Sequence, residues 1–265
     1  MRTESIDFLI ALVETIRKAI HREGNKSDVS DIVGITDSDV TRKIDRIAED
    51  AAIDYLRKEG FNGCLISEES PPQQIGSISE KAVILDPLDG STNFIRSIPF
   101  SSISVALASL QKDNETLHLE TGVVKDLSNG DLYYADKGYG AYLNGEKTSI
   151  NQKLDSKPLV SVYAYGENIK RNLNKIHKYC NIRAYGSIAL ELAYVTTLKL
   201  DGLIDIREKI RLLDIAAGKL ILEEAGGVLS DDRGNPLHLK IGGKYSVIAS
   251  KIHEYHEWFI DLLKV

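Results

Sequence analysis

Two stretches near the start of the chain have apolar residues at helical spacing. The first predicts an amphipathic helix that ends near Gly24, with its apolar face formed by Ile6, Leu9, Val13, Ile16 and Ile20. The second predicts a helix from about Val40 to Lys58 that stops at Gly60. Residues 24–38 between them are rich in Gly, Ser and Asp, have no clear period and are predicted to form a mobile loop.

Short apolar runs, typical of strands, follow the second helix. The first two cover residues 64–66 and 82–85, and each ends in acidic residues. Between residues 101 and 150, turn signals separate further β-segments, at 103–110, 117–124, 132–135 and 141–143. This alternation of strands and short turns predicts an antiparallel meander.

The pattern changes beyond a polar connector at residues 150–158. Expected strands now alternate with expected helices, including helices at 168–179, 187–198 and 214–225. Such alternation predicts a parallel or mixed sheet that is covered on both faces. We therefore expect α+β followed by α/β, with an N-terminal domain at 1–155 and a C-terminal domain at 156–265.

The charge of the chain excludes some classes of partner. The net charge is −6, from 33 Lys and Arg against 39 Asp and Glu, and the two signs are mixed along the sequence. No basic stripe is present that would favour nucleic acid or an anionic membrane surface. The cysteines, Cys64 and Cys180, have no pairing pattern and are interpreted as free thiols in a reducing compartment, so a cytoplasmic protein is expected.

The clearest candidate for chemistry is the run from Ala82 to Phe94. Asp86 and Asp89 follow a buried strand, where bare carboxylates would cost on the order of several kcal/mol. Pro87 fixes the backbone, Gly90 permits a tight approach to a ligand, and three polar residues follow. One interpretation is a hard-cation site beside an anion-binding turn; the other is an ordinary turn between strands. The buried strand and the hydroxyl run favour the site.

Two further acidic residues belong to the same hypothesis. Glu68 ends the preceding strand, so if the two strands lie side by side, three carboxylates gather, and a divalent metal is the usual reason to tolerate such repulsion. Asp214 begins a helix of small residues, where the positive helix end favours its ionised form. A plain helix cap would also explain Asp214. The small residues behind it would allow a close approach to another backbone.

These motifs together resemble a known family. Glu68-Glu69-Ser70, the run from Asp86 to Asn93, and Asp214-Ile215-Ala216-Ala217-Gly218 are similar, in order and wording, to motifs of the inositol monophosphatase family. Within it, the chain resembles the archaeal enzymes that act both as fructose-1,6-bisphosphatase and as inositol-1-phosphatase. The resemblance implies a layered αβαβα sandwich of the sugar-phosphatase type and a metal-dependent phosphoric monoester hydrolase.

The resemblance also assigns roles to residues. It implies two or three Mg²⁺ ions, with Mn²⁺ as a substitute, and its metal ligands are Glu68, Asp86, the backbone carbonyl of Leu88, Asp89 and Asp214. Asp37 or Asp39 would help to hold a third ion. Asp45 and Ser91 would orient and deprotonate the attacking water, while the N–H groups of Gly90, Ser91 and Thr92 would bind phosphate. Glu49, one turn after Asp45, is interpreted as a helix-surface residue or a support of the site.

Substrate choice depends on Arg207. It stands where inositol-specific members carry a glutamate, and its guanidinium suits a second phosphate. Tyr165, Lys170 and Arg183 would line the same pocket. The alternative is that Arg207 is an exposed charge in a charged run. We therefore expect fructose 1,6-bisphosphate to be converted to fructose 6-phosphate, with inositol 1-phosphate as a second substrate.

Three alternatives stay open. The chain could act on inositol monophosphates alone, or on 3′-phosphoadenosine 5′-phosphate. The residues after Gly90, Ser91-Thr92-Asn93, disfavour the second of these substrates. A non-catalytic metal-binding regulatory protein is the third. The partners expected are a small phosphorylated sugar or polyol and a second copy of the chain in a homodimer.

Overall fold

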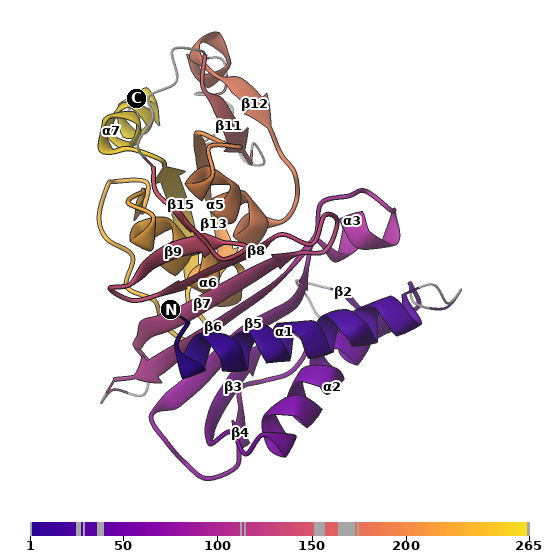
Figure 1. Ribbon diagram of the computed structural model, residues 1–265. Helices are drawn as coiled ribbons and strands as arrows, with labels where there is room; N and C mark the ends of the chain where they lie inside the picture. Colours follow the sequence, from indigo (N-terminus) through magenta and orange to yellow (C-terminus); the bar gives the residue numbers. More distant parts are fainter. Residues whose placement is uncertain are drawn as a thin grey trace.

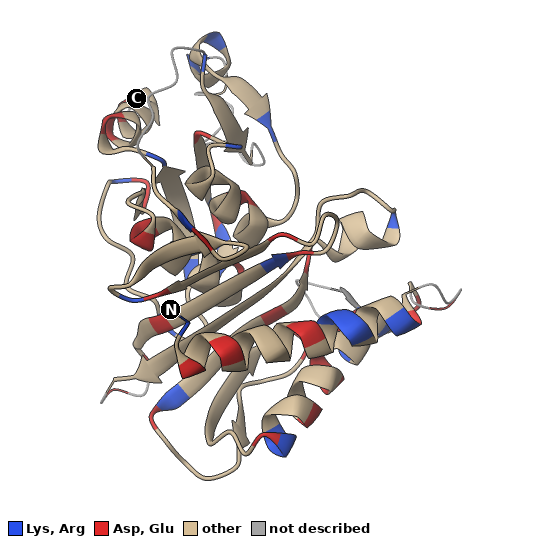
Figure 2. Cartoon of the chain, in the orientation of Figure 1, with Lys and Arg blue, Asp and Glu red and all other residues tan. Residues whose placement is uncertain are grey.

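Two helices form one outer layer of the computed structural model (Figure 1), which describes residues 2–24, 28, 30–35, 40–111, 113, 115–150, 157–163, 173 and 175–263. They are α1 (Glu4–Glu23) and α2 (Lys43–Lys58). The first turn of α1 carries Glu4 and Asp7, and its last turn carries His21 and Arg22, an order that complements the helix dipole, although Glu23 also lies at the end of the helix (Figure 2). No helix in the described part of the chain is long and apolar enough to cross a membrane.

The first sheet has eight strands in the order β10-β9-β8-β7-β6-β5-β3-β4. Neighbours from β5 to β10 are antiparallel, which confirms the predicted meander, and β3 runs parallel to β5, as the side-by-side arrangement required. The strands are β3 (Gly63–Ser67), β4 (Gln73–Ile75), β5 (Lys81–Asp89), β6 (Ser102–Leu110), β7 (Leu117–Asp126), β8 (Leu132–Asp136), β9 (Gly140–Leu143) and β10 (Glu146–Thr148).

The second sheet has five strands in the order β12-β11-β13-β15-β14. β11 is parallel to β12 and β13, whereas β15 is antiparallel to β13 and β14, so the sheet is mixed as predicted. Its strands are β11 (Leu159–Val162), β12 (Asn181–Arg183), β13 (Gly202–Arg211), β14 (Val228–Ser230) and β15 (Lys244–Ser250). The other helices whose bounds fall within the described residues are α3 (Ser91–Ile95), α5 (Ile188–Thr196), α6 (Leu212–Glu224) and α7 (His253–Leu263).

The elements stack as five layers. α1 and α2 cover one face of the first sheet, α5 and α6 lie between the two sheets, and α7 covers the outer face of the second (Figure 1). Strand β5 shows why: Val83 and Leu85 join the core under α1 and α2, while Ala82 and Ile84 join the core with α5 and α6. The predicted αβαβα sandwich is therefore confirmed.

Small residues bring α6 close to its neighbours. A Cβ on Gly122 of β7 would lie 3.1 Å from Cα of Ala217, and a Cβ on Gly218 would lie 2.8 Å from Cβ of Leu192 in α5. These contacts confirm the expectation that the small residues after Asp214 permit close backbone approach. The start of α6 is thus held tightly between the two sheets.

The segment predicted as a loop at 24–38 contains a strand. β1 (Ile32–Ile35) pairs with β2 (Val40–Arg42) in an antiparallel hairpin, so α2 begins at Lys43 and not at Val40. The prediction was wrong because strands of four and three residues are too short for a period to show among Gly, Ser and Asp. Of the helix expected at 168–179, residues 173 and 175–179 are described and are helical.

Candidate active site

The ends of β3 and β5 bring acidic residues to one edge of the first sheet. Ser67 pairs with Leu85 in the parallel ladder, so Glu68 and Asp86 both come directly after this pair. A register shift between Asp86 and Asp89 interrupts the pairing with β6, and both carboxylates are buried, with exposures of 1% and 8%. The Asp86 side chain accepts a hydrogen bond from N–H of Leu88 at 3.1 Å, which tightens this turn.

Two more carboxylates are held at helix starts. Asp214 accepts a hydrogen bond from the N–H of Arg211 at 2.7 Å, and Asp45 accepts one from the N–H of Arg42 at 3.0 Å. Each therefore occupies the third position of its helix, α6 or α2, where the positive end of the helix dipole favours a negative charge. The plain N-cap interpretation of Asp214 was therefore wrong, because Arg211 is the N-cap of α6 and Asp214 closes its capping box from the third position.

Arg211 joins the acidic residues from different elements. Its guanidinium donates to Oε1 of Glu68 at 2.6 Å and to Oδ1 of Asp214 at 2.9 Å. Arg211 was not among the predicted site residues, although it stands three residues before Asp214. Arg211 is 143 positions away from Glu68 in the sequence, so its contact with both carboxylates can be recognised only once the sheets are assembled.

The electrostatics show that four carboxylates form one group, which we call the carboxylate cluster (Glu68, Asp86, Asp89 and Asp214). Burial raises the pKa of Asp86 well above its usual range, and the charges of Glu68, Asp89 and Asp214 raise it further. Burial and then the charge of Asp214 raise the pKa of Asp89 to about 7. Burial and mutual repulsion thus make the ionised forms of Asp86 and Asp89 costly, although Arg211 opposes both shifts.

This cluster suits a hard divalent cation. All its donors are carboxylate oxygens, the ligands that Mg²⁺ prefers, and their mutual repulsion would be relieved by added positive charge. In the structure, Arg211 supplies part of that positive charge. Burial alone would lower the pKa of Arg211, but the charges of Asp214 and Glu68 raise it overall, so the guanidinium stays protonated. Within the described residues, no three His, Cys, Asp or Glu side chains already stand in the geometry of a metal site.

The turn after the cluster is closed by Gly90. It adopts a left-handed φ of +86°, and a Cβ there would lie 3.1 Å from the carbonyl oxygens of Gly186 and Phe100. Only glycine suits both constraints. The predicted phosphate-binding residues Ser91 and Thr92 follow in α3, so their N–H groups lie at a helix start. The pairing of Ser91 with Asp45 stays a prediction.

The substrate side of the site agrees only in part with the sequence analysis. The Arg207 side chain is 18% exposed, so it is not the exposed charge of the alternative interpretation. Its Nε and Nη2 donate to the fully buried Asp205 at 2.8 and 2.5 Å, and its guanidinium lies 4.6 Å from the ring centre of Tyr163. Arg183 is exposed and donates to its neighbour's carbonyl.

Other predicted residues lie outside the description or were misjudged. Tyr165, Lys170, Asp37 and Asp39 lie outside the described residues, and their roles stay predictions. Glu49 is fully buried, so the helix-surface interpretation was wrong, while the other interpretation, a support of the site, stays a prediction. Oε1 of Glu49 accepts a hydrogen bond from the hydroxyl of Ser70 at 2.6 Å. The helix turns this side chain inward, toward the segment that follows Glu68.

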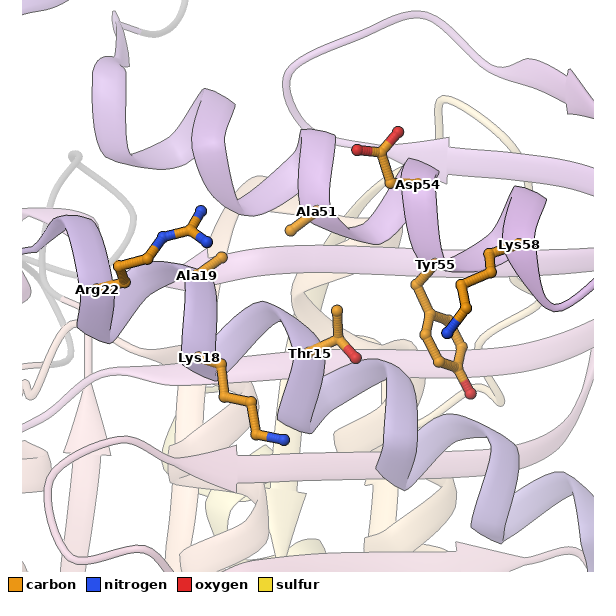
Figure 3. Close-up of a pocket in the computed structure, with 8 residues that line it drawn as sticks. All are labelled: Thr15, Lys18, Ala19, Arg22, Ala51, Asp54, Tyr55 and Lys58. Carbon is orange, nitrogen blue, oxygen red and sulfur yellow. The ribbon is translucent and has the colours of Figure 1, made fainter.

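A separate groove lies between α1 and α2 (Figure 3). Its volume is about 470 Å³, and its lining is of mixed charge, with Lys18, Arg22, Asp54 and Lys58 around Tyr55. None of its lining residues belongs to the carboxylate cluster. The candidate active site is therefore the acidic edge of the first sheet, not this groove.

This five-layer fold, with carboxylates at the edge of a sheet, matches a family whose members are named as phosphoric monoester hydrolases, and the chain is assigned to that class of enzyme. The sequence profile of the inositol monophosphatase family matches residues 1–264. The chain therefore belongs to the inositol monophosphatase family, which is generally metal-dependent. This confirms the resemblance drawn from the three motifs.

Individual relatives agree with this placement. The chain is 36% identical to a fructose-1,6-bisphosphatase/inositol-1-monophosphatase of Methanothermobacter thermautotrophicus, over 97% of this chain and 95% of that protein. It is 35% identical to a bifunctional NADP phosphatase/NAD kinase of Methanococcus maripaludis, over 93% of this chain but 47% of that protein. The crystal structure of an inositol monophosphatase–fructose 1,6-bisphosphatase superposes with a TM-score of 0.84 at 31% identity, covering 99% of this chain and 100% of the other.

Proposed function

We propose that this protein is a Mg²⁺-dependent phosphomonoesterase that hydrolyses fructose 1,6-bisphosphate to fructose 6-phosphate and also hydrolyses inositol 1-phosphate. The observation that carries the proposal is the carboxylate cluster, whose four acidic side chains come from two strand ends and a helix start. The names of the archaeal relatives support the pair of substrates.

In this proposal each part of the site has a task. Glu68, Asp86, Asp89, Asp214 and the carbonyl of Leu88 would hold two or three ions. Bound there, the ions would supply charge that stabilises both the attacking and the leaving oxygen. Asp45 and Ser91 would orient the attacking water and accept its proton. The N–H groups of Gly90, Ser91 and Thr92 would hold the phosphate oxygens.

Arg207 is the proposed recognition group for a second phosphate. Asp205 already pairs with two of its nitrogens, so the guanidinium is held in a fixed direction by a buried partner. A fixed fork is well suited to recognise phosphate geometry, although part of its charge is already balanced. We also infer that the protein acts as a homodimer in the cytoplasm and that a boundary near residue 155 divides its two domains.

The first experiment measures phosphate release with and without Mg²⁺ from fructose 1,6-bisphosphate, inositol 1-phosphate and NADP, all on one preparation. Mg²⁺-dependent turnover of the first two substrates at comparable rates is expected. Turnover of inositol 1-phosphate alone would contradict the bisphosphate assignment, and turnover of NADP alone would place the chain with its NADP phosphatase relative. No Mg²⁺-dependent release from any of the three would remove the proposed function.

A variant of Arg207 tests the choice of substrate. Arg207→Lys keeps a positive charge beside Asp205 but loses the planar fork. We expect KM for fructose 1,6-bisphosphate to rise about tenfold, the effect of roughly 1.4 kcal/mol, while KM for inositol 1-phosphate changes little. Arg57→Lys, at an exposed position in the last turn of α2, is the matched control, because Arg57 has no predicted role in the site. Equal changes with both substrates would mean that Arg207 has no role in choosing between them.

A further inference from the structure

Glu191 is a buried carboxylate that the proposed reaction does not use. It lies in α5 with an exposure of 0%. A single oxygen, Oε1, accepts three hydrogen bonds: from the hydroxyl of Tyr163 at 3.0 Å, from N–H of Tyr185 at 2.8 Å and from N–H of Gly186 at 3.2 Å. Burial raises the pKa of Glu191 to about 7, although the hydrogen bonds that the carboxylate accepts act in the opposite direction and lower it. A buried acid is costly to keep, so its contacts merit a functional explanation.

Two of these donors belong to the turn that connects β12 to α5. The turn is also held from the opposite side, because Nδ2 of Asn93 in α3 donates to the carbonyl of Tyr185 at 2.6 Å. Gly186 has a left-handed φ of +91°, and a Cβ there would lie 3.1 Å from Nδ2 of Asn93. The turn is therefore clamped between Glu191 and the first residues after Gly90.

The same turn holds a member of the carboxylate cluster. The hydroxyl of Ser187 donates to Oδ2 of Asp89 at 2.7 Å, and N–H of Ala189 donates to the same oxygen at 2.9 Å. Both donors lie within four residues of Glu191 in the chain. The direction in which Asp89 faces the cluster thus depends on a turn that Glu191 holds in place.

The third donor to Glu191, the hydroxyl of Tyr163, connects it with the predicted substrate-binding residue Arg207. The hydroxyl of Tyr163 binds Glu191 and also accepts a hydrogen bond from N–H of Gly186 at 3.0 Å, so its ring is fixed. The guanidinium of Arg207 lies over that ring. One buried carboxylate therefore connects the predicted metal ligand Asp89 with the predicted recognition group Arg207.

We propose that Glu191 is a positioning residue, which orients Asp89 through the turn at 185–187 and Arg207 through Tyr163. The role assigned to Asp89 rests on the proposed function. Groups that orient metal ligands typically change metal affinity or activity by about 10- to 100-fold when they are removed. The proposal predicts an effect of this size from a residue that touches neither metal nor substrate.

The test compares two substitutions of similar length. Glu191→Gln keeps an oxygen acceptor for the three donors, whereas Glu191→Met removes it. Mg²⁺ binding is measured by calorimetry without substrate, alongside kcat, KM and the melting temperature. We expect Glu191→Met to weaken Mg²⁺ binding and to lower kcat by about tenfold or more, and Glu191→Gln to stay within about threefold of the unchanged protein.

A control on the same helix separates positioning from stability. Thr196, at the far end of α5, is buried and donates to the carbonyl of Ala193 at 2.7 Å. Thr196→Val should lower the melting temperature without changing Mg²⁺ affinity. If Glu191→Met does not fold, Ser187→Ala tests the same connection, because it removes a donor to Asp89 directly. That variant should also bind Mg²⁺ about tenfold more weakly.

The outcomes separate this inference from the proposed function. Mg²⁺ affinity and kcat within twofold of the unchanged protein in Glu191→Met would overturn the inference and leave the function intact, as would an unchanged Mg²⁺ affinity in Ser187→Ala. An equal loss in Glu191→Gln would overturn it too, since charge and not position would then matter. If the unchanged protein releases no phosphate, the proposed function is refuted. The role of Glu191 is then tested only by comparing the Mg²⁺ affinities of Glu191→Met and the unchanged protein by calorimetry.

Discussion

Two regions of this protein bury charged or polar side chains in opposite ways. The carboxylate cluster gathers four acidic side chains around one arginine, and it raises the pKa values of Asp86 and Asp89. Beneath α7, by contrast, the polar groups form matched pairs, which we call the α7 pairs: Lys251 with Asp201, 2.5 Å apart, and His256 with Ser230, 2.8 Å apart. Lys251 is fully buried, and Asp201 is 4% exposed.

This difference distinguishes a candidate ion-binding site, the carboxylate cluster, from the α7 pairs, which stabilise the fold. The buried ion pair balances its own charge, although Nζ of Lys251 and Oδ1 of Asp201 make no well-aligned hydrogen bond in the described part of the chain. Such a pair needs no added ion, so it contributes to one arrangement of the chain. An unbalanced cluster has an electrostatic cost that a bound cation would relieve. We infer that substitutions in the cluster mainly change activity, and that substitutions in the α7 pairs mainly change stability.

The largest effect is expected from Asp89→Asn. It removes one negative charge from the cluster and keeps the size of the side chain, so activity at saturating Mg²⁺ should fall on the order of a thousandfold, or about 4 kcal/mol in the barrier. The melting temperature in EDTA should not fall, because a repulsive interaction has been removed. Phosphate release and thermal melting measure the two effects. Full activity in Asp89→Asn would refute metal-dependent hydrolysis at this site.

The next effect is expected from Lys251→Met. Removal of one partner leaves Asp201 as an uncompensated buried charge, which typically costs about 3–5 kcal/mol of unfolding free energy. Activity per folded molecule should be unchanged. Urea unfolding monitored by circular dichroism measures the loss, and the double variant Lys251→Met, Asp201→Asn should recover part of it. A loss of activity without a loss of stability would contradict the division between the two regions.

The smallest effect concerns pH and His256. Burial, with a further contribution from His253, lowers the pKa of His256 from 6.5 to about 4 in the folded protein. Between about pH 6.5 and 4 the unfolded chain therefore binds the additional proton, and stability is lost as the pH falls through this window. His256→Gln should lose less stability than the unchanged protein between these pH values, as measured by urea unfolding. Parallel curves for the two proteins would contradict the assignment.

Sequence reasoning succeeded where local pattern and local chemistry coincide. The apolar runs before Glu68 and Asp86 predicted two strands that end in acid, and the strands do lie side by side and parallel. The small residues after Asp214 predicted close packing, which α6 shows against Gly122. Each of these signals is carried by a few consecutive residues, so no knowledge of distant parts of the chain was needed.

It failed where the signal was short or non-local. The strand β1 was missed because four residues carry too little pattern. The surface interpretation of Glu49 was wrong because a helical period does not show what packs against the helix. Arg211 is only three residues before Asp214 in the sequence, but its second partner, Glu68, is 143 residues away. Nothing near Arg211 in the sequence indicates that contact.

By itself, the sequence determined the longer helices and strands, the acidic ends of two strands and the motifs that place the chain in its family, because these depend on periodicity and on neighbouring residues. The tertiary structure alone decided which charges meet. Ser187 reaches Asp89 across 98 positions, Tyr163 reaches Glu191 across 28, and Arg211 reaches Glu68 only after the two sheets pack around α5 and α6. Electrostatic energy depends on distance in space and on burial, and both are properties of the assembled layers.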